Sequence, residues 1–342
     1  MDPTAVRRLG RSTVGVTQLG LGGAALGDLY HTVTDDQATA TLQAAWDAGL
    51  RYFDTAPWYG RGLSEHRFGR FLHRKARSDF VLSTKVGRIL RAAKRPEAFD
   101  PAPWVGGLPF DVVFDYSYDG IMRAYEDSLQ RLGMPRIDMV LIHDLDFWYH
   151  APELRVNAYL GQLVTSGWRA LEELRQAGLL RAVGVGINEL GMIPRFLEML
   201  DLDFVLLALR YTLMEQDTLE VELPLCVARN VSVVAGAVFN SGLLATGPIA
   251  GARYNYADPR PQDLEKVRRI EAICKRHGVP LPAAALQFPL GHPGVAAVLV
   301  GAFTPDQVRA NIDFFQKEIP TDLWAELKGS GLLREDAPTP TD

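Results

Sequence analysis

Residues 51–85, RYFDTAPWYGRGLSEHRFGRFLHRKARSDFVLSTK, contain a complete strand–helix–strand unit. The short apolar runs at Arg51–Asp54 and Phe80–Lys85 predict buried strands, and the amphipathic segment Ser64–Leu72 between them predicts a helix. Strands that alternate with helices pair in parallel and are buried on both faces. This stretch therefore predicts an α/β protein built on a parallel sheet.

The same alternation continues along the rest of the chain. Further strands are expected at Gln18–Gly22, Met139–His143, Ala182–Ile187, Phe204–Ala208, Ser232–Val238 and Val298–Gly301. Further helices are expected at Asp35–Ala48, Tyr118–Leu132, Gly167–Gln176, Ile193–Leu200, Leu219–Arg229, Asp263–Arg276 and Asp306–Phe315. Thr34 or Asp35 is the expected N-cap of the first helix. About eight strand–helix units with no break in composition predict a (β/α)₈ TIM barrel rather than an open sheet.

The chain has no linker rich in Pro, Gly and Ser, so we expect residues 1–333 to form one domain. Residues 334–342, which contain Pro-Thr-Pro-Thr, are expected to be a disordered tail. Two connections, Gly87–Ser117 and Asp144–Ser166, are longer than ordinary loops. Both follow the carboxyl ends of predicted strands, where the loops of such barrels build active sites.

Charge and composition exclude several classes of protein. The 342 residues include 36 Lys and Arg against 41 Asp and Glu, a net charge of −5 without the positive surplus that nucleic-acid binding uses. No signal peptide is recognisable in Met1–Gly10, and apolar runs such as Val295–Phe303 are shorter than the ~20 residues of a membrane helix. We expect a soluble, cytoplasmic protein that binds a small molecule, in an oligomeric state that the sequence leaves open.

Cysteine and histidine patterns give no sign of a disulfide framework or a metal centre. Cys226 and Cys274 are too few for either a disulfide framework or a four-cysteine zinc site. The spacing of His143, Asp144, Asp146 and His150 matches no common zinc-binding motif.

Four polar side chains are predicted to meet at the carboxyl ends of the strands. Asp54, Lys85 and His143 each end a predicted strand, and Tyr59 lies in the loop that follows Asp54. Each alone has an ordinary explanation: a turn cap, a solvent-exposed lysine, a packed aromatic or a hydrogen-bonded core histidine. Together they suggest acid–base chemistry. A phenol titrates near pH 10; an ammonium favours its ionised form, a carboxylate holds that ammonium, and a histidine orients a substrate oxygen.

The run Asp54-Thr-Ala-Pro-Trp-Tyr59-Gly60, followed by Ser64-Glu65, Thr84-Lys85 and Leu141-Ile-His143-Asp144, resembles the aldo-keto reductases. The likeness extends from Gln18-Leu-Gly-Leu-Gly-Gly23 to Thr304-Pro-Asp-Gln-Val-Arg-Ala-Asn311 and so covers nearly the whole chain. It implies a barrel that binds NAD(P) across its mouth without a Rossmann domain. It also implies that Tyr59 exchanges the proton, that Lys85 and Asp54 tune Tyr59, and that His143 orients the substrate oxygen.

Further segments resemble one branch of that family, the D-threo-aldose 1-dehydrogenases, which includes sugar dehydrogenases and a pyridoxal 4-dehydrogenase. These segments are Phe-Asp-Tyr-Ser-Tyr-Asp119, Gly-Val-Gly-Ile-Asn188, Arg-Tyr-Thr-Leu-Met214 and Phe-Asn-Ser-Gly-Leu-Leu244.

The resemblance also implies where the cofactor binds. Gly23 is interpreted as a turn under the nicotinamide, with simple turn chemistry as the alternative. Asn188 is expected to bind the carboxamide or, alternatively, to cap the next helix. The loop expected to wrap the pyrophosphate consists of Phe239, Asn240, Ser241, Gly242 and Leu243. The position of the aromatic residue that stacks on the nicotinamide in many relatives is Gly236 here, and Phe239 is its possible replacement.

The last strand and helix predict a preference for NAD over NADP. Relatives that prefer NADP resemble Lys-Ser-x-Thr-Pro-x-Arg here, whereas Gly301 and Gln307 occupy the matched Lys and Arg positions. A 2′-phosphate without charged donors loses much of its binding energy. Phe303 lies between the two positions, and Asn311 is expected near the adenine. Arg309 is on another face of the helix, from which it could still reach the phosphate.

Aromatic residues in the loops suggest a sugar substrate. Tyr30, Trp58 and Trp148 are expected at the mouth, where rings can stack on the C–H faces of a sugar, although packing of the loops is the alternative. Asp115, Asp144 and Asp146 are candidate acceptors for sugar hydroxyls.

The predicted function is NAD-dependent oxidation of the anomeric C1 hydroxyl of an aldose to the aldonolactone. In this reaction Tyr59 receives the proton and nicotinamide C4 the hydride. The alternatives are oxidation of pyridoxal at its hemiacetal carbon, reduction of an aldehyde or ketone with NADPH, and a regulatory subunit that senses the nucleotide.

Overall fold

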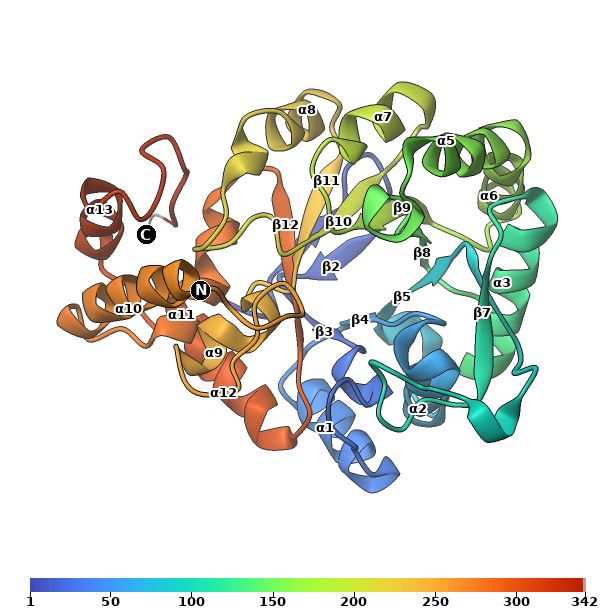
Figure 1. The fold of residues 1–342 in the computed structure, drawn as a ribbon, viewed down its shortest axis with the longest axis horizontal. Helices are drawn as coiled ribbons and strands as arrows, with labels where there is room; N and C mark the ends of the chain where they lie inside the picture. Colours follow the sequence, from blue (N-terminus) through green and yellow to red (C-terminus); the bar gives the residue numbers. More distant parts are fainter. Residues whose placement is uncertain (341–342) are drawn as a thin grey trace.

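The computed structural model describes residues 1–340, and its centre is a closed barrel of eight parallel strands (Figure 1). In chain order the strands are β3 (Leu19–Gly22), β4 (Tyr52–Asp54), β5 (Val81–Val86), β8 (Met139–His143), β9 (Ala182–Ile187), β10 (Phe204–Ala208), β11 (Ser232–Gly236) and β12 (Val295–Gly301). The last strand, β12, pairs with the first, β3, and this pairing closes the barrel. The predicted (β/α)₈ barrel is confirmed.

Helices surround the barrel and follow its strands in sequence order (Figure 1). They include α1 (Asp35–Asp47), α2 (Leu63–Leu72), α3 (Tyr118–Leu132), α6 (Trp168–Gln176), α7 (Met192–Met199), α8 (Glu222–Ala228), α11 (Leu281–Gln287) and α12 (Pro305–Gln316). Thr34 is the N-cap of α1, and its hydroxyl accepts the N–H of Gln37 at 3.1 Å, which confirms one of the two predicted caps.

The region after β11 contains three helices that the sequence pattern did not indicate, α9 (Leu243–Thr246), α11 and α13 (Thr321–Gly329). The expected helix forms as α10 (Pro261–Arg276), which contacts α11 and α13. In the barrel wall α11 contacts α12 and the short helix α9. Six of the seven residues of α11, LPAAALQ, are buried, so it lacks the polar face that marks an amphipathic helix.

The two ends of the barrel are covered differently. A hairpin of β1 (Val6–Arg8) and β2 (Gly15–Thr17) packs its apolar residues against the amino ends of the barrel strands. The long connections lie at the other end. The first contains the antiparallel hairpin of β6 (Arg88–Ala92) and β7 (Phe110–Phe114), and the second contains α4 (Phe147–His150) and α5 (Glu153–Gln162). Because these segments follow the carboxyl ends of strands, they frame the mouth of the barrel.

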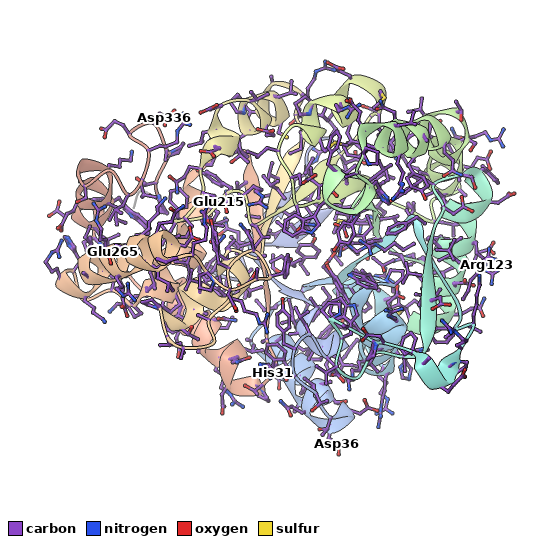
Figure 2. The ribbon with its side chains drawn as sticks, in the orientation of Figure 1. His31, Asp36, Arg123, Glu215, Glu265 and Asp336 are labelled. Carbon is purple, nitrogen blue, oxygen red and sulfur yellow. The ribbon has the colours of Figure 1, made fainter. Side chains whose placement is uncertain are left out.

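The predicted disorder of residues 334–342 is wrong for the part that the structure describes. The Arg334 guanidinium lies 2.9 Å from Glu220 and 2.9 Å from Asp336, and Ala337 is completely buried. Asp336 is labelled at the edge of the molecule in Figure 2. Ion pairs and apolar burial together hold residues 334–340 against the barrel, although their composition is typical of disorder. Residues 341–342 lie outside the described range.

Candidate active site

A buried ion pair lies where β4 and β5 end. Asp54 and Ser83 are neighbours in the register of these two strands, and Lys85 follows on the same face as Ser83. Lys85 Nζ lies 2.6 Å from Asp54 Oδ1 and donates to the carbonyl oxygen of Thr55 at 2.9 Å. The Ser83 hydroxyl donates to the other Asp54 oxygen at 2.6 Å. Both charged side chains are only 1% exposed, so each depends on the other for its counter-charge.

Tyr59 lies beside this ion pair in the turn that leaves β4. The turn requires glycine at position 60, where φ is 62° and an added Cβ would lie 2.6 Å from the Gly27 carbonyl oxygen. Lys85 Nζ lies 4.6 Å from the centre of the Tyr59 ring. The ring also contacts the Trp104 ring, with centres 5.6 Å apart, and meets the edge of the His143 ring at 6.0 Å. The predicted catalytic residues are therefore gathered in one place.

The electrostatics keep Tyr59 protonated, in contrast to the phenolate that the sequence suggested. Burial raises the pKa of the Tyr59 phenol well above 10, and the Asp54 and Asp144 carboxylates raise it further. Lys85 cannot offset this effect in full because its charge is already neutralised by Asp54. Tyr59 is therefore present as the protonated phenol, which can donate a proton. It becomes a proton acceptor only when its pKa is lowered or the pH is raised.

His143 is neutral at the same site. Burial lowers the pKa of the His143 imidazole well below 6.5, and the positive charges of Arg88 and Lys85 lower it further. Its Nε2 atom lies 3.1 Å from Asp144 Oδ2. Its Nδ1 atom is buried and has no hydrogen-bond partner within residues 1–340.

Two charged residues that contact this cluster received no specific role from the sequence. Arg88, the first residue of β6, and Asp144, directly after β8, form an ion pair that is almost completely buried. Asp144 had been only one of several possible acceptors for sugar hydroxyls. Arg88 could have been identified from the sequence because it lies two residues after the end of β5. Lys85 was identified from the same feature, its position at the end of a strand.

The predicted carboxamide ligand, Asn188, lies at the end of β9. Its amide nitrogen donates to Asp144 Oδ1 at 2.9 Å, and its backbone carbonyl accepts Arg210 Nε at 2.6 Å. The alternative role, as a helix cap, is wrong because the N-cap of α7 is Gly191. Arg210 is a further residue of this wall that the sequence did not single out.

The predicted pyrophosphate loop forms a tight turn after β11. Ser241 and Gly242 have φ values of 60° and 104°, and the Gly242 N–H donates to the Phe239 carbonyl at 3.0 Å. Leu243 is buried in the core, so only its backbone can serve a ligand. Asn240 is completely buried, and its Oδ1 atom has no partner among the described residues. Pyrophosphate oxygens only accept hydrogen bonds, so this acceptor fits a ligand hydroxyl rather than the pyrophosphate itself.

Gly23 has a packing role in the structure. Its N–H donates to the Asp54 carbonyl at 2.7 Å, and its own carbonyl accepts the Ser64 hydroxyl at 2.8 Å. A Cβ at this position would lie 2.5 Å from the Ser64 oxygen. Glycine is therefore required for close packing, which favours turn chemistry over a polar contact to the nicotinamide.

The segment predicted to select the cofactor is held by internal hydrogen bonds. The Gln307 side chain accepts the Phe303 N–H at 2.7 Å. Arg309 is paired with Asp306 at 2.5 Å, and Asn311 is buried. His31, labelled in Figure 2, lies edge-on to the Phe303 ring with ring centres 5.6 Å apart. Gly301 at the end of β12 is exposed.

The three predicted substrate aromatics occupy different surroundings. The Trp58 ring contacts the Trp104 ring, with centres 5.5 Å apart, and Trp104 in turn contacts Tyr59. Tyr30 lies under the Arg253 guanidinium at 4.4 Å. Trp148 is 41% exposed, and its ring meets that of Tyr256.

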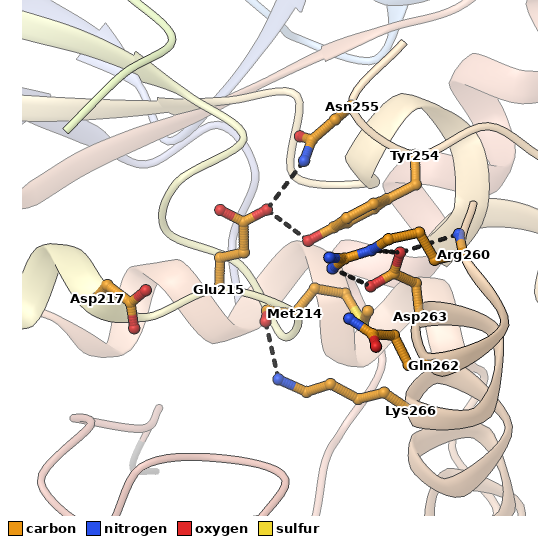
Figure 3. Close-up of a pocket in the computed structure, with 9 residues that line it drawn as sticks. All are labelled: Met214, Glu215, Asp217, Tyr254, Asn255, Arg260, Gln262, Asp263 and Lys266. Atoms are coloured by element: carbon orange, nitrogen blue, oxygen red, sulfur yellow. Dashed lines mark hydrogen bonds and ion pairs between the residues drawn. The ribbon is translucent and has the colours of Figure 1, made fainter. Parts of the chain in front are cut away.

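A hollow of about 520 Å³ lies outside the catalytic cluster, between the loop after β10 and the start of α10 (Figure 3). Glu215 ties its walls together: one carboxylate oxygen accepts the Tyr254 hydroxyl at 2.5 Å and the other accepts Arg210 at 2.7 Å. These bonds fix the loop that carries Tyr256, whose ring contacts Trp148. We assign the chemistry to the Tyr59 cluster rather than to this hollow.

The fold and this cluster define a class of protein: a (β/α)₈ barrel with a buried tyrosine beside a lysine–aspartate pair and a neutral histidine at its mouth. Comparison with known proteins agrees. The model of the aldo/keto reductase family matches residues 18–331, so the chain belongs to that family.

None of the helices in residues 1–340 is long and apolar enough to cross a membrane.

Individual relatives are similar over nearly their whole length. A pyridoxal 4-dehydrogenase of Microbacterium luteolum is 43% identical over 96% of this chain and 97% of its own. A D-threo-aldose 1-dehydrogenase of a Pseudomonas species is 42% identical over 95% of this chain and 96% of its own. The structure of a glycerol dehydrogenase from Gluconobacter oxydans covers 99% of this chain and 98% of its own, with a TM-score of 0.75 and 25% identity. The protein is thus an oxidoreductase that acts on a small alcohol or aldehyde with a nicotinamide cofactor.

Proposed function

We propose that the protein oxidises the anomeric C1 hydroxyl of an aldose to the aldonolactone, with NAD⁺ as the electron acceptor. The observation that carries this proposal is the contact of Tyr59 with both the Lys85–Asp54 pair and the neutral His143. This arrangement serves proton transfer to or from a substrate oxygen. The 42% identity to a D-threo-aldose 1-dehydrogenase supports the substrate class.

The roles of the side chains follow from their surroundings. Tyr59, once ionised, takes the proton of the C1 hydroxyl. His143, as a neutral ring, forms a hydrogen bond to the substrate and orients it. A bound nicotinamide supplies the acceptor for the C1 hydrogen and its two electrons. Trp58 and Trp104 provide apolar walls on which the C–H face of a sugar can pack.

The residues around the barrel mouth fit a nicotinamide dinucleotide. Asn188 presents its amide at the end of β9, and the turn at Phe239–Gly242 contains the unsatisfied Asn240 acceptor. At the far end, Gly301, Phe303, Gln307 and Asn311 would receive the adenosine half. These residues are proposed to hold the cofactor.

Pyridoxal is the second candidate substrate. The 43% identity to a pyridoxal 4-dehydrogenase favours it, and its hemiacetal carbon carries the same H–C–O–H group as an aldose C1. The same residues would act on both substrates. The choice between them depends on which ring the aromatic walls accept.

A substrate panel tests the proposal directly. We expect NADH formation with at least one of L-fucose, D-arabinose, L-galactose and L-xylose, and a lower kcat/KM with pyridoxal. The absorbance of NADH measures each rate, and product analysis should identify a lactone. Oxidation of pyridoxal alone would support the second candidate. No turnover of any sugar or of pyridoxal with either nucleotide would contradict the proposed function.

Cofactor preference gives a separate prediction. We expect kcat/KM for NAD⁺ to exceed that for NADP⁺ by at least about tenfold, because a 2′-phosphate would lack a charge-assisted hydrogen bond worth roughly 1.5–3 kcal/mol. Gln307→Arg should narrow this ratio by about tenfold. Arg309→Ala is the matched control and should leave the ratio unchanged, since Asp306 already neutralises that arginine. Equal use of both nucleotides by the unmodified protein would refute the preference.

A further inference from the structure

Residues 253–256, here called the strap, contact connections that leave the barrel on opposite sides. The Arg253 guanidinium carbon lies 4.4 Å from the centre of the Tyr30 ring, in the connection after β3. The Tyr256 ring meets that of Trp148, in the connection after β8, with centres 6.0 Å apart. In the closed barrel β3 and β8 are separated by β4 and β5 on one side and by β12, β11, β10 and β9 on the other. A short segment that contacts both connections must therefore cross the mouth between them.

The strap is also tied to two further strand ends. The Tyr256 N–H donates to Ser241 Oγ at 3.0 Å, in the turn after β11. Figure 3 shows Tyr254 and Asn255 turned toward Glu215, which pairs with Arg210 in the connection after β10. These bonds hold the backbone of the strap without using the hydroxyl of the Tyr256 side chain.

The strap contains a tight turn with a bulky residue where glycine is usual. Tyr254 and Ala257 exchange backbone hydrogen bonds of 2.8 and 3.0 Å, so Asn255 and Tyr256 form the two-residue turn between them. Their φ values are 50° and 61°. Such a turn favours Asn followed by Gly, because most side chains are strained at positive φ. Asn255 fits this preference and Tyr256 does not, and strain of this kind is frequent at sites that contact a ligand.

The Tyr256 side chain faces the inside of the mouth. Burial raises the pKa of its phenol well above 10, and the charges of Tyr59, Tyr149, Asp144 and Tyr30 are close enough to raise it further. The residue is nevertheless 40% exposed. A side chain that is exposed and yet surrounded by the groups of the catalytic cluster borders an enclosed space, which is where a substrate beside Tyr59 would lie.

We propose that Tyr256 is a specificity-determining residue that covers the substrate and selects compounds with a ring. An aromatic side chain packs well on the face of another ring, whether the C–H face of a sugar or the pyridine of pyridoxal. An open-chain alcohol has no ring face and gains little from this contact. The inference rests on the proposed function in one respect, that the substrate is cyclic, and it holds for an aldose and for pyridoxal alike.

Steady-state kinetics of the full-length protein on the best cyclic substrate of the panel test this role. Tyr256→Ala should raise KM by roughly tenfold and change kcat by less than about threefold, because a contact made equally in the ground and transition states affects binding alone. Tyr256→Phe keeps the ring and should restore KM to within about threefold of the unmodified value. Glycerol, an open-chain alcohol, should have a kcat/KM as low in the Tyr256→Ala variant as in the unmodified protein.

Tyr256→Gly separates substrate binding from folding. Glycine adopts a φ of 61° without strain, so the melting temperature should not fall, whereas KM should rise as in Tyr256→Ala. A purely structural role predicts the opposite, a lower melting temperature with an unchanged KM. The glycine variant also covers the case in which Tyr256→Ala does not fold. Tyr118→Ala is the matched control: its ring lies under Arg169 on α3, at 4.6 Å, and its loss should leave KM unchanged.

The outcomes distinguish this inference from the proposed function. A KM within about twofold of the unmodified value in both Tyr256→Ala and Tyr256→Gly would overturn the role of Tyr256 and leave the substrate assignment intact. A kcat/KM for glycerol above that of every cyclic compound, or no turnover of any cyclic compound, would overturn both. Oxidation of pyridoxal alone would overturn the aldose assignment only, because the same variants would then raise KM for pyridoxal.

Discussion

Tyr59→Phe should lower kcat for alcohol oxidation by roughly 10²–10⁴-fold, the range typical of a lost general acid or base. The phenylalanine ring can keep the packing against Trp104 and His143, so only the hydroxyl that exchanges the proton is removed. Thermal stability and cofactor affinity should therefore change little. Steady-state kinetics on the best substrate of the panel, with a thermal melt of each protein, measure both effects.

The pH profile supplies the control for this variant. Because the pKa of Tyr59 is raised, the ionised form needed for oxidation becomes more populated as the pH increases. Oxidation by the unmodified protein should therefore rise with pH, and the residual activity of Tyr59→Phe should lack this rise. Tyr118→Phe removes a hydroxyl that bonds Glu173 on the outside of the barrel and should leave both rate and profile unchanged. A Tyr59→Phe protein that keeps more than about a tenth of kcat would contradict the assigned role.

Lys85→Met should reduce both stability and activity because it leaves the Asp54 carboxylate buried without a counter-charge. Removing one partner of a buried ion pair typically costs about 3–5 kcal/mol of unfolding free energy. Activity should fall by roughly 10²-fold or more, since the ammonium that lies 4.6 Å from the Tyr59 ring is lost. Urea unfolding and kcat, measured on the same preparations, test the two effects.

The double variant Asp54→Asn with Lys85→Met separates the two contributions. Both charges are then absent, so most of the stability should return, whereas the activity should remain low. Arg123→Met is a control on α3. Arg123, which is labelled in Figure 2, is 61% exposed and pairs with Asp127. It should change the unfolding free energy by less than about 1 kcal/mol. Equal stability losses in the single and double variants would show that the charge of Asp54 is not the cause.

The repeating pattern of the chain was sufficient to predict the barrel. Each barrel strand is a short apolar run, and most of the surrounding helices carry a clear amphipathic pattern, so local periodicity identifies both. The pattern failed where burial is complete or where structure forms inside a loop. Helix α11 is almost entirely buried, and the β6–β7 hairpin lies within a connection that has no regular alternation.

The candidate site could be predicted in part for a related reason. Asp54, Lys85 and His143 lie at the ends of their predicted strands. The barrel geometry brings strand ends together, so these positions alone predicted that the three side chains meet. The same reasoning could not reveal that Arg309 is already paired with Asp306, because that depends on side-chain conformation. It also could not foresee that burial, together with the Asp54 and Asp144 carboxylates, keeps Tyr59 protonated.

The sequence by itself determined the order of the eight barrel strands, the parallel barrel and the identity of the four residues at its mouth. All of these depend on patterns within a few turns of chain. The tertiary structure decided the ordering of residues 334–340 and the pairing of Arg88 with Asp144. Arg88 and Asp144 are 56 positions apart, and they meet only because the hairpin folds back over the barrel and buries both charges. Burial makes their pairing obligatory, and no local pattern encodes which distant charge becomes the partner.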